Sequence, residues 1–448
     1  MDRQKKRILL TILVVAFIQM PGLALTPGIN QIKTSAFSDY SLGAVQTALA
    51  FSALAQPVAA FGAAMLINRR IVTKKAVIVF GLFLLSATGA LAFVANTEFY
   101  HLIILSVLLG VSTGLFISNM FGLIFDNFDP MERQSIVGWQ TSVINAGGIM
   151  MSLMGGLLAT YMWYGGYTML LVGLPAAILT IIAVPNYITA EPETASTPGT
   201  EPGSESSAER GAERLEEGEA DVTEKLISER DAAEKLITEK SVEKKSAPGR
   251  LNPRIFYYCC AACLFMMTYS VCGSNLSTHI AGLGGTATAG IAIAIQMGGG
   301  VVSGLFFGKL SQKAGDYSLS IALCAVFTGY ILLSLFPSSL VLVFISVFIV
   351  GIALSIMLPR CIFMVSTLAL DKSTSATATA LVSVVSPSAG IFLSPIIFTN
   401  ITTALFGEST SARYRFVGIV VLIIAAVIAV TTARRNKLTN IAAPEELQ

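Results

Sequence analysis

The chain has 448 residues, of which 54% are hydrophobic and only 12% are charged, and its formal net charge is +2. A water-soluble protein of this length would form about three domains, but this composition is typical of integral membrane proteins. It excludes an ordinary soluble globular fold. The membrane-spanning helix is therefore the unit to look for along the chain.

A helix that crosses a bilayer needs about 20 mostly apolar residues, because its backbone polar groups must bond to one another where no water is present. Twelve segments meet this criterion. In chain order they are Ile8–Ile29, Ser41–Ile67, Ala76–Ala95, Tyr100–Phe125, Ser135–Thr160, Tyr164–Tyr187, Ile255–His279, Thr286–Phe307, Ser318–Phe336, Ser339–Leu370, Ser375–Leu405 and Arg415–Thr432. The sequence thus predicts an all-α integral membrane protein with twelve transmembrane helices.

Two of these spans contain helix-breaking residues. Pro21 and Pro27, each followed by a glycine, fall within the first span, and Pro387 and Pro395 fall within the eleventh. Proline lacks a backbone N–H and cannot continue the hydrogen-bond ladder of a helix. We therefore predict that both spans are interrupted.

Lys and Arg gather on one side of the predicted spans. Fifteen lie in the short segments that share a side with the N-terminus, whereas the loops of the other side carry only Lys33, Arg413 and Arg415. Cytoplasmic loops of membrane proteins carry the excess of Lys and Arg. The sequence therefore predicts a multi-pass protein of the cell membrane with both termini in the cytoplasm.

A charged segment divides the spans into two sets of six, since 16 of the 27 Asp and Glu residues lie between Glu191 and Glu243. Its first half is too polar to bury a core and is expected to be disordered. Its second half repeats "TEKLISER" as "AEKLITEK" and favours a short helix, either solvated or partner-binding. The predicted divisions are an N-terminal bundle (1–188), a cytoplasmic linker (189–253), a C-terminal bundle (254–433) and a cytoplasmic tail (434–448).

The two sets of spans resemble each other internally. "LLGVSTGLFISNMFGLIFDNF" matches "FIVGIALSIMLPRCIFMVSTLAL", which pairs Gly110 with Gly351 and Asn119 with Arg360. Likewise the end of the second span, at Asn68, corresponds to Gln312 at the end of the eighth. Such repeats are typical of secondary transporters.

The stretch "GKLSQKAGD" follows the eighth span, and its first-block counterpart is "INRRIVTKK". The first stretch resembles the signature loop of the major facilitator superfamily, with an amide at the position that is acidic in the family. The resemblance covers nearly the whole chain and implies two pseudo-symmetric six-helix bundles, with a gating role for both loops; a simple helix-anchoring loop is the alternative. The loop residues concerned are Gly308, Gln312, Lys313 and Gly315 in the second block, and Asn68, Arg69, Lys74 and Lys75 in the first.

By the same resemblance, the first, fourth, seventh and tenth helices line a central path. Thr268, Cys272, Asn275 and His279 form a polar stripe at helical spacing on the seventh. Buried amides either bind a solute or join helices in lipid, and both roles stay open here. The candidate substrate-binding residues are Gln19, Asn30, Asn119, Gln140, Asn275, Gln296 and Arg360.

Arg360 is the only charge that the predicted spans place well inside the membrane. An Arg near the bilayer centre costs about 2.5 to 3.5 kcal/mol on insertion scales, so a compensating role is expected. We expect no acid within the membrane to neutralise it, which favours contact with an anionic solute or a gating partner. The alternative is that its long side chain reaches to lipid headgroups.

The sequence therefore predicts a secondary transporter that moves a small organic solute by alternating access, anionic if Arg360 contacts it. The alternatives are an exporter of drugs or amphipathic toxic compounds by proton antiport and, from another class, a non-transporting membrane sensor. An enzyme is not expected, because two isolated histidines and no intramembrane carboxylates leave no acid–base pair or metal site. The expected partners are the solute with a coupling ion and the lipid bilayer, with no nucleic acid and no cofactor.

Overall fold

The first transmembrane segment begins as the helix α1 (Arg3–Phe17) in a computed structural model that describes residues 3–128, 130–184, 252–368 and 377–442. Helices are the only regular elements within these ranges. The linker helix and the disorder predicted for residues 189–251 lie outside the described residues. The predicted all-α fold is confirmed.

Eleven helices of the described ranges are long and apolar enough to cross a membrane, and a twelfth results if one bent pair counts as a single span. This agrees with the predicted twelve. The N-terminal set continues with α3 (Leu42–Asn68), α4 (Lys74–Leu91), α5 (Phe99–Asn127), α6 (Pro130–Tyr161), and η4 (Gly165–Val172) with α7 (Gly173–Ala183). The C-terminal set comprises α9 (Pro253–Ile280), α10 (Gly285–Ala314), α11 (Tyr317–Leu335), α12 (Leu340–Leu368), the segment 377–406 and α16 (Thr410–Ala442).

The bent pair is the first span, whose two parts meet at 40°. After α1 the chain forms short turns of 3-10 helix at Pro21–Ala24 and Thr26–Gly28, then α2 (Ile29–Gln31) and a π turn at Ile32–Ala36. Both 3-10 turns carry proline in their first two positions, where its missing N–H is tolerated. The predicted interruption is confirmed.

The eleventh span is also irregular. Two π turns, at Leu381–Val385 and Pro395–Thr399, flank α14 (Ser386–Ser394), and α15 (Asn400–Phe406) completes the segment. Pro387 and Pro395 lie at the starts of α14 and of the second π turn. Pi turns inside helices frequently occur at functional sites.

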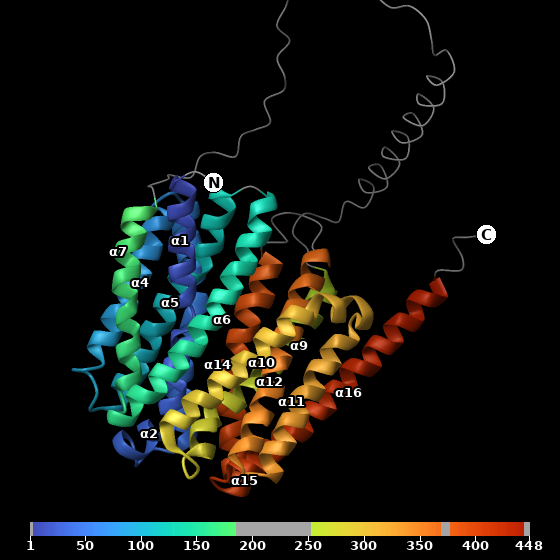
Figure 1. The fold of residues 1–448 in the computed structure, drawn as a ribbon. Coiled ribbons are helices and arrows are strands. Elements are labelled where there is room, and N and C mark those ends of the chain that lie inside the picture. The colour runs from blue at the N-terminus through green and yellow to red at the C-terminus, as the bar shows by residue number, and fades with distance from the viewer. Residues whose placement is uncertain (1–2, 129, 185–251, 369–376, 443–448) are drawn as a thin grey trace, which may run out of the picture. The chain divides into compact units, whose positions relative to one another are not determined.

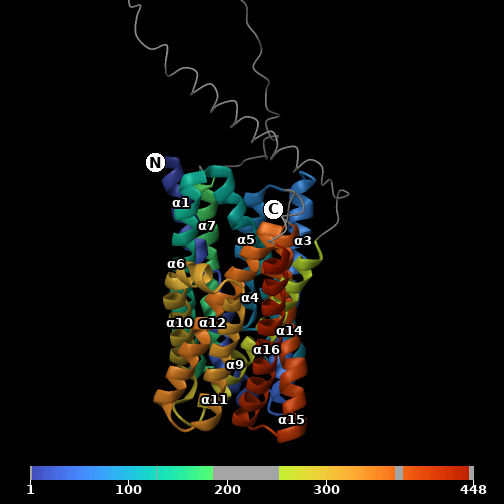
Figure 2. The same ribbon diagram turned by 90° about the vertical axis from the view of Figure 1, so that its right-hand side faces the viewer.

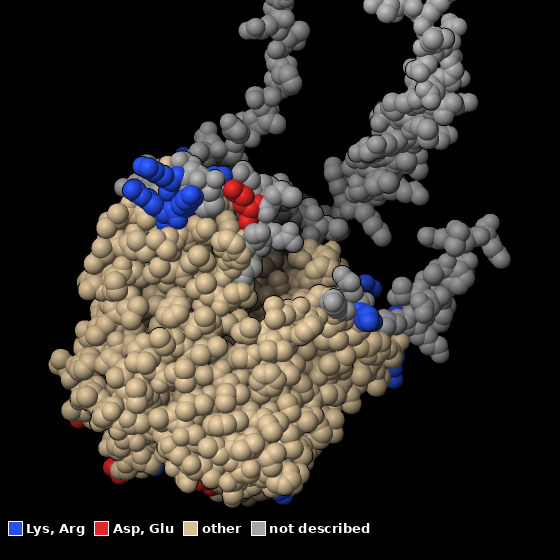
Figure 3. Space-filling view, viewed as in Figure 1, with Lys and Arg blue, Asp and Glu red and all other residues tan. Residues whose placement is uncertain are grey.

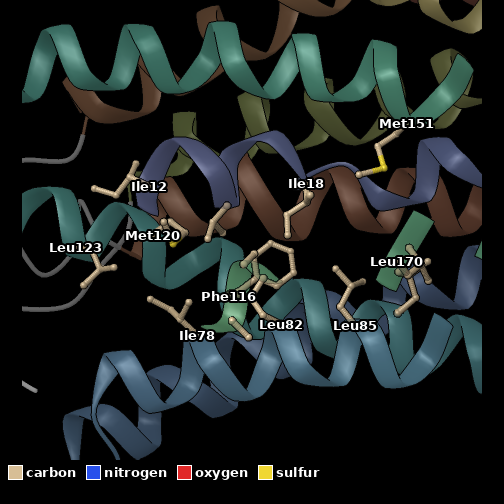
Figure 4. Packing of buried hydrophobic residues seen from close by; sticks show 14 of the residues in the cluster. Ile12, Ile18, Ile78, Leu82, Leu85, Phe116, Met120, Leu123, Met151 and Leu170 are labelled. Carbon is tan, nitrogen blue, oxygen red and sulfur yellow. The ribbon is translucent and has the colours of Figure 1, made fainter. Parts of the chain in front are cut away.

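Figures 1 and 2 show the helices of each set running up and down side by side. In the N-terminal bundle a hydrophobic core joins α1, α4, α5, α6 and η4. Figure 4 shows Phe116 of α5 at its centre, with Ile18 of the first span on one side and Leu82 of α4 on the other. Dense apolar packing of this kind makes a bundle rigid.

The predicted pairing of Gly110 with Gly351 corresponds to equivalent contacts. A Cβ atom on Gly110 of α5 would collide with the carbonyl oxygen of Ser52 on α3, and one on Gly351 of α12 would collide with that of Gln296 on α10. Helices in membranes approach most closely where residues are small. Each glycine therefore allows the second and fourth helices of its bundle to touch.

Lys and Arg gather at the end of the bundles where the N-terminus lies, which we call the basic end (Figure 3). Lys33, in the turn that ends the first span, and Glu98, which precedes α5, lie at the other end of the helices, which we call the opposite end. Both bundles belong to one compact unit, and Figure 3 shows its surface hollowed toward the basic end. The contacts that join the bundles are therefore of functional interest.

Candidate functional site

A single amide joins the two bundles near the opposite end. Gln46 of α3 is buried, and its Nε2 donates to the carbonyl oxygen of Ser274 (2.8 Å) and to Oδ1 of Asn275 (3.1 Å), both on α9. Its Oε1 accepts from the hydroxyl of Thr399 at 2.6 Å. Both the donors and the acceptor of the Gln46 amide are therefore used in hydrogen bonds between the two bundles.

Two further contacts close the same end. The backbone N–H of Asn30 donates to Oγ of Ser277 at 3.1 Å. On the other side, α6 meets α10 so closely that a Cβ on Gly156 would lie 2.9 Å from the Cα of Gly290. Together with Gln46 these contacts form the structure that we call the outer closure, after the outer side that the sequence predicts for this end.

Arg413 lies directly behind the outer closure and is 0% exposed. Its Nη1 donates to Oδ1 of Asn275, its Nε to Oγ1 of Thr402 (2.9 Å) and its Nη2 to Oγ1 of Thr403 (2.9 Å). The sequence analysis placed Arg413 in an outer loop, and this is wrong. The last helix already begins at Thr410, so its first turn carries the side chain inward.

Arg360 lies at the basic end of the C-terminal bundle. Its Nε and Nη2 donate to Oδ1 of Asp316 at 3.2 and 2.9 Å, and its Nη1 donates to Oγ of Ser311 at 3.0 Å. The expectation that no acid neutralises Arg360 is therefore wrong. Asp316 belongs to the short turn between α10 and α11, which reaches the level of the buried guanidinium.

The second oxygen of Asp316 binds two more elements. Oδ2 accepts from the hydroxyl of Tyr258 on α9 (2.7 Å) and lies 3.4 Å from Nη1 of Arg435 on α16. The Arg435 guanidinium also lies over the rings of Tyr257 and Tyr258, 5.5 and 5.8 Å from their centroids. One carboxylate thus ties α9, α12 and α16 to the turn after α10. We call this group of residues the basic-end cluster.

The last residues of the loop 308–316 determine its geometry. Gly308 lies within α10, Lys313 is exposed in its last turn, and Gly315 ends the helix with φ +52°, a left-handed conformation that favours glycine. This turn places Asp316 in the basic-end cluster. The Gln312 side chain lies outside the described residues. The sequence analysis thus found the loop but missed Asp316, although it quoted that residue as the end of the motif.

The first-block loop has different contacts. Asn68 ends α3, Arg69 caps it, and Lys74 and Lys75 begin α4. The Lys75 ammonium group donates to a backbone carbonyl near the end of α7 at 2.8 Å. This contact of Lys75 differs from the contacts of Asp316 in the second loop.

The remaining amide candidates differ in how their polar atoms are bonded. Asn119 donates to a carbonyl of its own helix at 2.7 Å, and Gln296 is buried in α10. Gln140 is buried with neither amide atom bonded to a described residue, and the same holds for Oε1 of Gln19. A buried polar atom without a partner costs about 1 to 3 kcal/mol, so these two amides are the candidates with unused binding capacity.

Most of the polar stripe predicted on the seventh helix faces the interior of the C-terminal bundle. Thr268 bonds to carbonyl oxygens of its own helix, and the backbone N–H of Cys272 donates to the hydroxyl of Tyr330 at 3.0 Å. Nδ1 of His279 lies 2.8 Å from Oγ1 of Thr410. Cys272 thus joins α9 to α11, and His279 joins α9 to α16. Asn275 alone reaches the other bundle, through Gln46.

Gln46 was missed because polar stripes were sought on the helices expected to line the path, and the amides added from other spans, Gln140 and Gln296, did not include it. Gln46 lies on the second span, in a helix made mostly of small and apolar residues. A polar amide in such a helix is itself a signal, because it needs a partner in lipid. Applying the search to every span would have found it.

A family model described as Major Facilitator Superfamily matches residues 7–395. Among solved structures, the chain is similar to a bacterial homologue of the human lysosomal transporter Spinster in an inward-facing and occupied conformation. The two chains share 16% sequence identity with a TM-score of 0.66, and the match covers 97% of this chain and 98% of the other.

Two further solved structures are a peptide transporter POT in complex with sulfate (13% identity, TM-score 0.67, coverage 95% and 94%) and the nucleoside transporter NupG (11%, 0.65, 96% and 98%). No curated protein sequence matches the chain. At these identities the structural likeness shows the fold alone.

Proposed function

Because the chain belongs to the major facilitator superfamily, we propose that it is a secondary transporter that carries a small organic solute by alternating access between its two bundles. In this proposal the described conformation is closed at the opposite end and admits the solute from the basic end. The basic end faces the cytoplasm, because it carries most of the Lys and Arg residues.

The observation that carries the proposal is the outer closure at one end combined with the hollow toward the other. Four hydrogen bonds join the bundles there, three through Gln46 and one through Asn30. At about 0.5 to 1.5 kcal/mol net for each bond, they contribute roughly 2 to 6 kcal/mol. A difference of a few kcal/mol is the range in which a second conformation remains accessible.

The charges of the site favour an uncharged polar solute over an anion. An anion bound at Arg360 would have to displace Asp316, which already bonds to the guanidinium through two nitrogens. Arg413 is covered by Asn275 and Gln46. Among the candidate residues, the amides of Gln19 and Gln140 have buried polar atoms with no partner in the described residues, and the hydroxyls of Tyr167 and Tyr269 are unpartnered as well. We therefore assign solute recognition to neutral hydrogen-bonding groups.

A thermal-shift screen of the purified protein tests this assignment. Separate panels of organic anions, organic cations and uncharged polar compounds are compared on the wild type and on Arg360→Ala. A ligand at 100 times its Kd stabilises the folded state by about 2.7 kcal/mol. We expect uncharged compounds to stabilise both proteins equally. Stabilisation by anions that disappears in Arg360→Ala would refute the assignment and restore an anionic solute.

Transport is then measured in proteoliposomes with the compounds that stabilise the protein, with and without gradients of protons and sodium. Accumulation of the solute inside the vesicles is the expected result, and its dependence on one gradient identifies the coupling ion. Binding without flux under every gradient would reject the transporter and favour a membrane sensor. Protease access to a tag at either terminus, in sealed cells and in inverted vesicles, tests the cytoplasmic location of both ends.

A further inference from the structure

Arg413 is a fully buried arginine whose three bonded nitrogens all face neutral oxygens. No carboxylate of the described residues bonds to it, although Glu408 is near enough to interact with it electrostatically, whereas Arg360 and Arg435 share Asp316. A buried charge without a bonded counter-charge is costly, and replacing it with an apolar residue is often neutral or stabilising in proteins. We therefore expect Arg413 to have a role other than stabilising the C-terminal bundle.

The geometry of Asn275 indicates this role. Its Oδ1 accepts from both Arg413 and Nε2 of Gln46, while its Nδ2 donates to the carbonyl oxygen of Val271 (2.9 Å) and to Oγ of Ser274 (3.2 Å). Arg carries only donors. If the amide were reversed, its NH2 group would face two donors, so Arg413 keeps the oxygen directed at Gln46.

Arg413 also supports the acceptor side of Gln46. The Thr402 hydroxyl that it binds donates to the carbonyl oxygen of Phe398 at 2.5 Å, with the carbonyl oxygen of Thr399 at 3.2 Å, so it contacts the helical turn that carries Thr399. The hydroxyl of Thr399 then donates to Oε1 of Gln46 at 2.6 Å. The guanidinium thus bonds directly to the acceptor of the Gln46 NH2 group and, through Thr402, contacts the turn that carries the donor to Gln46 Oε1.

All three partners of Arg413 belong to its own bundle, so these bonds remain when the bundles separate. The bonds that break at this point are those of Gln46. We propose that Arg413 is a positioning residue that holds the C-terminal half of the outer closure ready for Gln46, and so sets how the chain divides between its two access states. This inference rests on the proposed alternating access.

Distance measurement across the opposite end tests the inference. Spin labels are attached at Thr97→Cys and Ala281→Cys, two exposed positions in turns of the N- and C-terminal bundles, in a full-length chain whose six native cysteines are replaced. Double electron–electron resonance then gives the fractions of closed and open molecules. Arg413→Gln is expected to raise the ratio of open to closed molecules at least tenfold. Arg413→Lys, which keeps the charge but not the planar fork, should raise it less.

Arg415→Gln is the matched control. Arg415 lies two residues further along α16, and its Nε donates to Oγ of Ser334 on α11 at 3.1 Å, away from the outer closure. We expect the Arg415→Gln variant to give the same distance distribution as the wild type, even if the variant unfolds at a lower temperature. Removal of Gln46 itself, by Gln46→Leu, serves as the variant that opens the closure directly.

The outcomes separate the two proposals. If Gln46→Leu opens the end and Arg413→Gln does not, the role of Arg413 is overturned while alternating access stands. If neither variant changes the distances, the outer closure does not control access and both proposals fail. Should Arg413→Gln not fold, Arg413→Lys takes its place, and a wild-type distribution in that variant overturns the inference.

Discussion

Asp316→Asn removes the charge at the centre of the basic-end cluster while it preserves the shape of the side chain. The Arg360 and Asp316 side chains are only 11% and 12% exposed, so their pair counts as buried. Breaking a buried pair costs about 3 to 5 kcal/mol, because the remaining charge loses its compensation. The Arg435 side chain is 35% exposed, and its loss of a partner adds no more than about 1 kcal/mol.

We therefore expect Asp316→Asn to lower the free energy of unfolding by about 3 to 5 kcal/mol. Unfolding is followed by circular dichroism in detergent micelles, for the wild type, Asp316→Asn, Arg360→Gln and the double variant. Because the single variants remove the same interaction, the double variant should lose much less stability than their sum.

Lys5→Gln is the control for loss of an ion pair at the membrane surface. Lys5 and Glu132 lie 3.2 Å apart, with side chains 33% and 36% exposed. Exposed pairs contribute about 0 to 1 kcal/mol, so this variant should change stability little. The reasoning is refuted if Asp316→Asn costs no more than Lys5→Gln, or if the two cluster variants add without coupling.

Three further results are expected. Gly351→Ala should lower the free energy of unfolding by about 1 to 3 kcal/mol, because the added Cβ would collide with the carbonyl oxygen of Gln296. Gly298→Ala should not lower it, because a Cβ at Gly298 would have no atom within 4 Å. Chemical unfolding of both variants measures the difference. Tyr258→Phe removes the hydroxyl that bonds to Asp316 and should cost about 0.5 to 1.5 kcal/mol in the same assay, so a loss as large as that of Asp316→Asn would contradict the assigned contacts. Asn275→Asp gives Arg413 a carboxylate partner and still offers an oxygen to Gln46. Spin labels across the opposite end should therefore show a smaller fraction of molecules open at that end, and a larger fraction would contradict the role assigned to Asn275.

The helical architecture could be read from the sequence because the demand of the bilayer is local. Each span must satisfy its own backbone, so about 20 apolar residues suffice to identify it wherever it lies. The break at Pro21 and Pro27 is equally local, since each proline removes a donor from its own turn. The pairing of Gly110 with Gly351 came from the internal repeat and corresponds to equivalent helix contacts.

The partners of the buried polar groups were decided by the tertiary structure. Hydropathy shows that Arg360 is buried, but not that a turn 44 residues earlier brings Asp316 to it. Gln46 and Asn275 are 229 residues apart, and they meet only because two separate bundles dock at one end. A polar group in lipid needs a partner, yet any donor or acceptor at the right depth satisfies that need. The sequence therefore determined the spans and their repeat, whereas the packing of the helices chose which polar groups form the outer closure and the basic-end cluster.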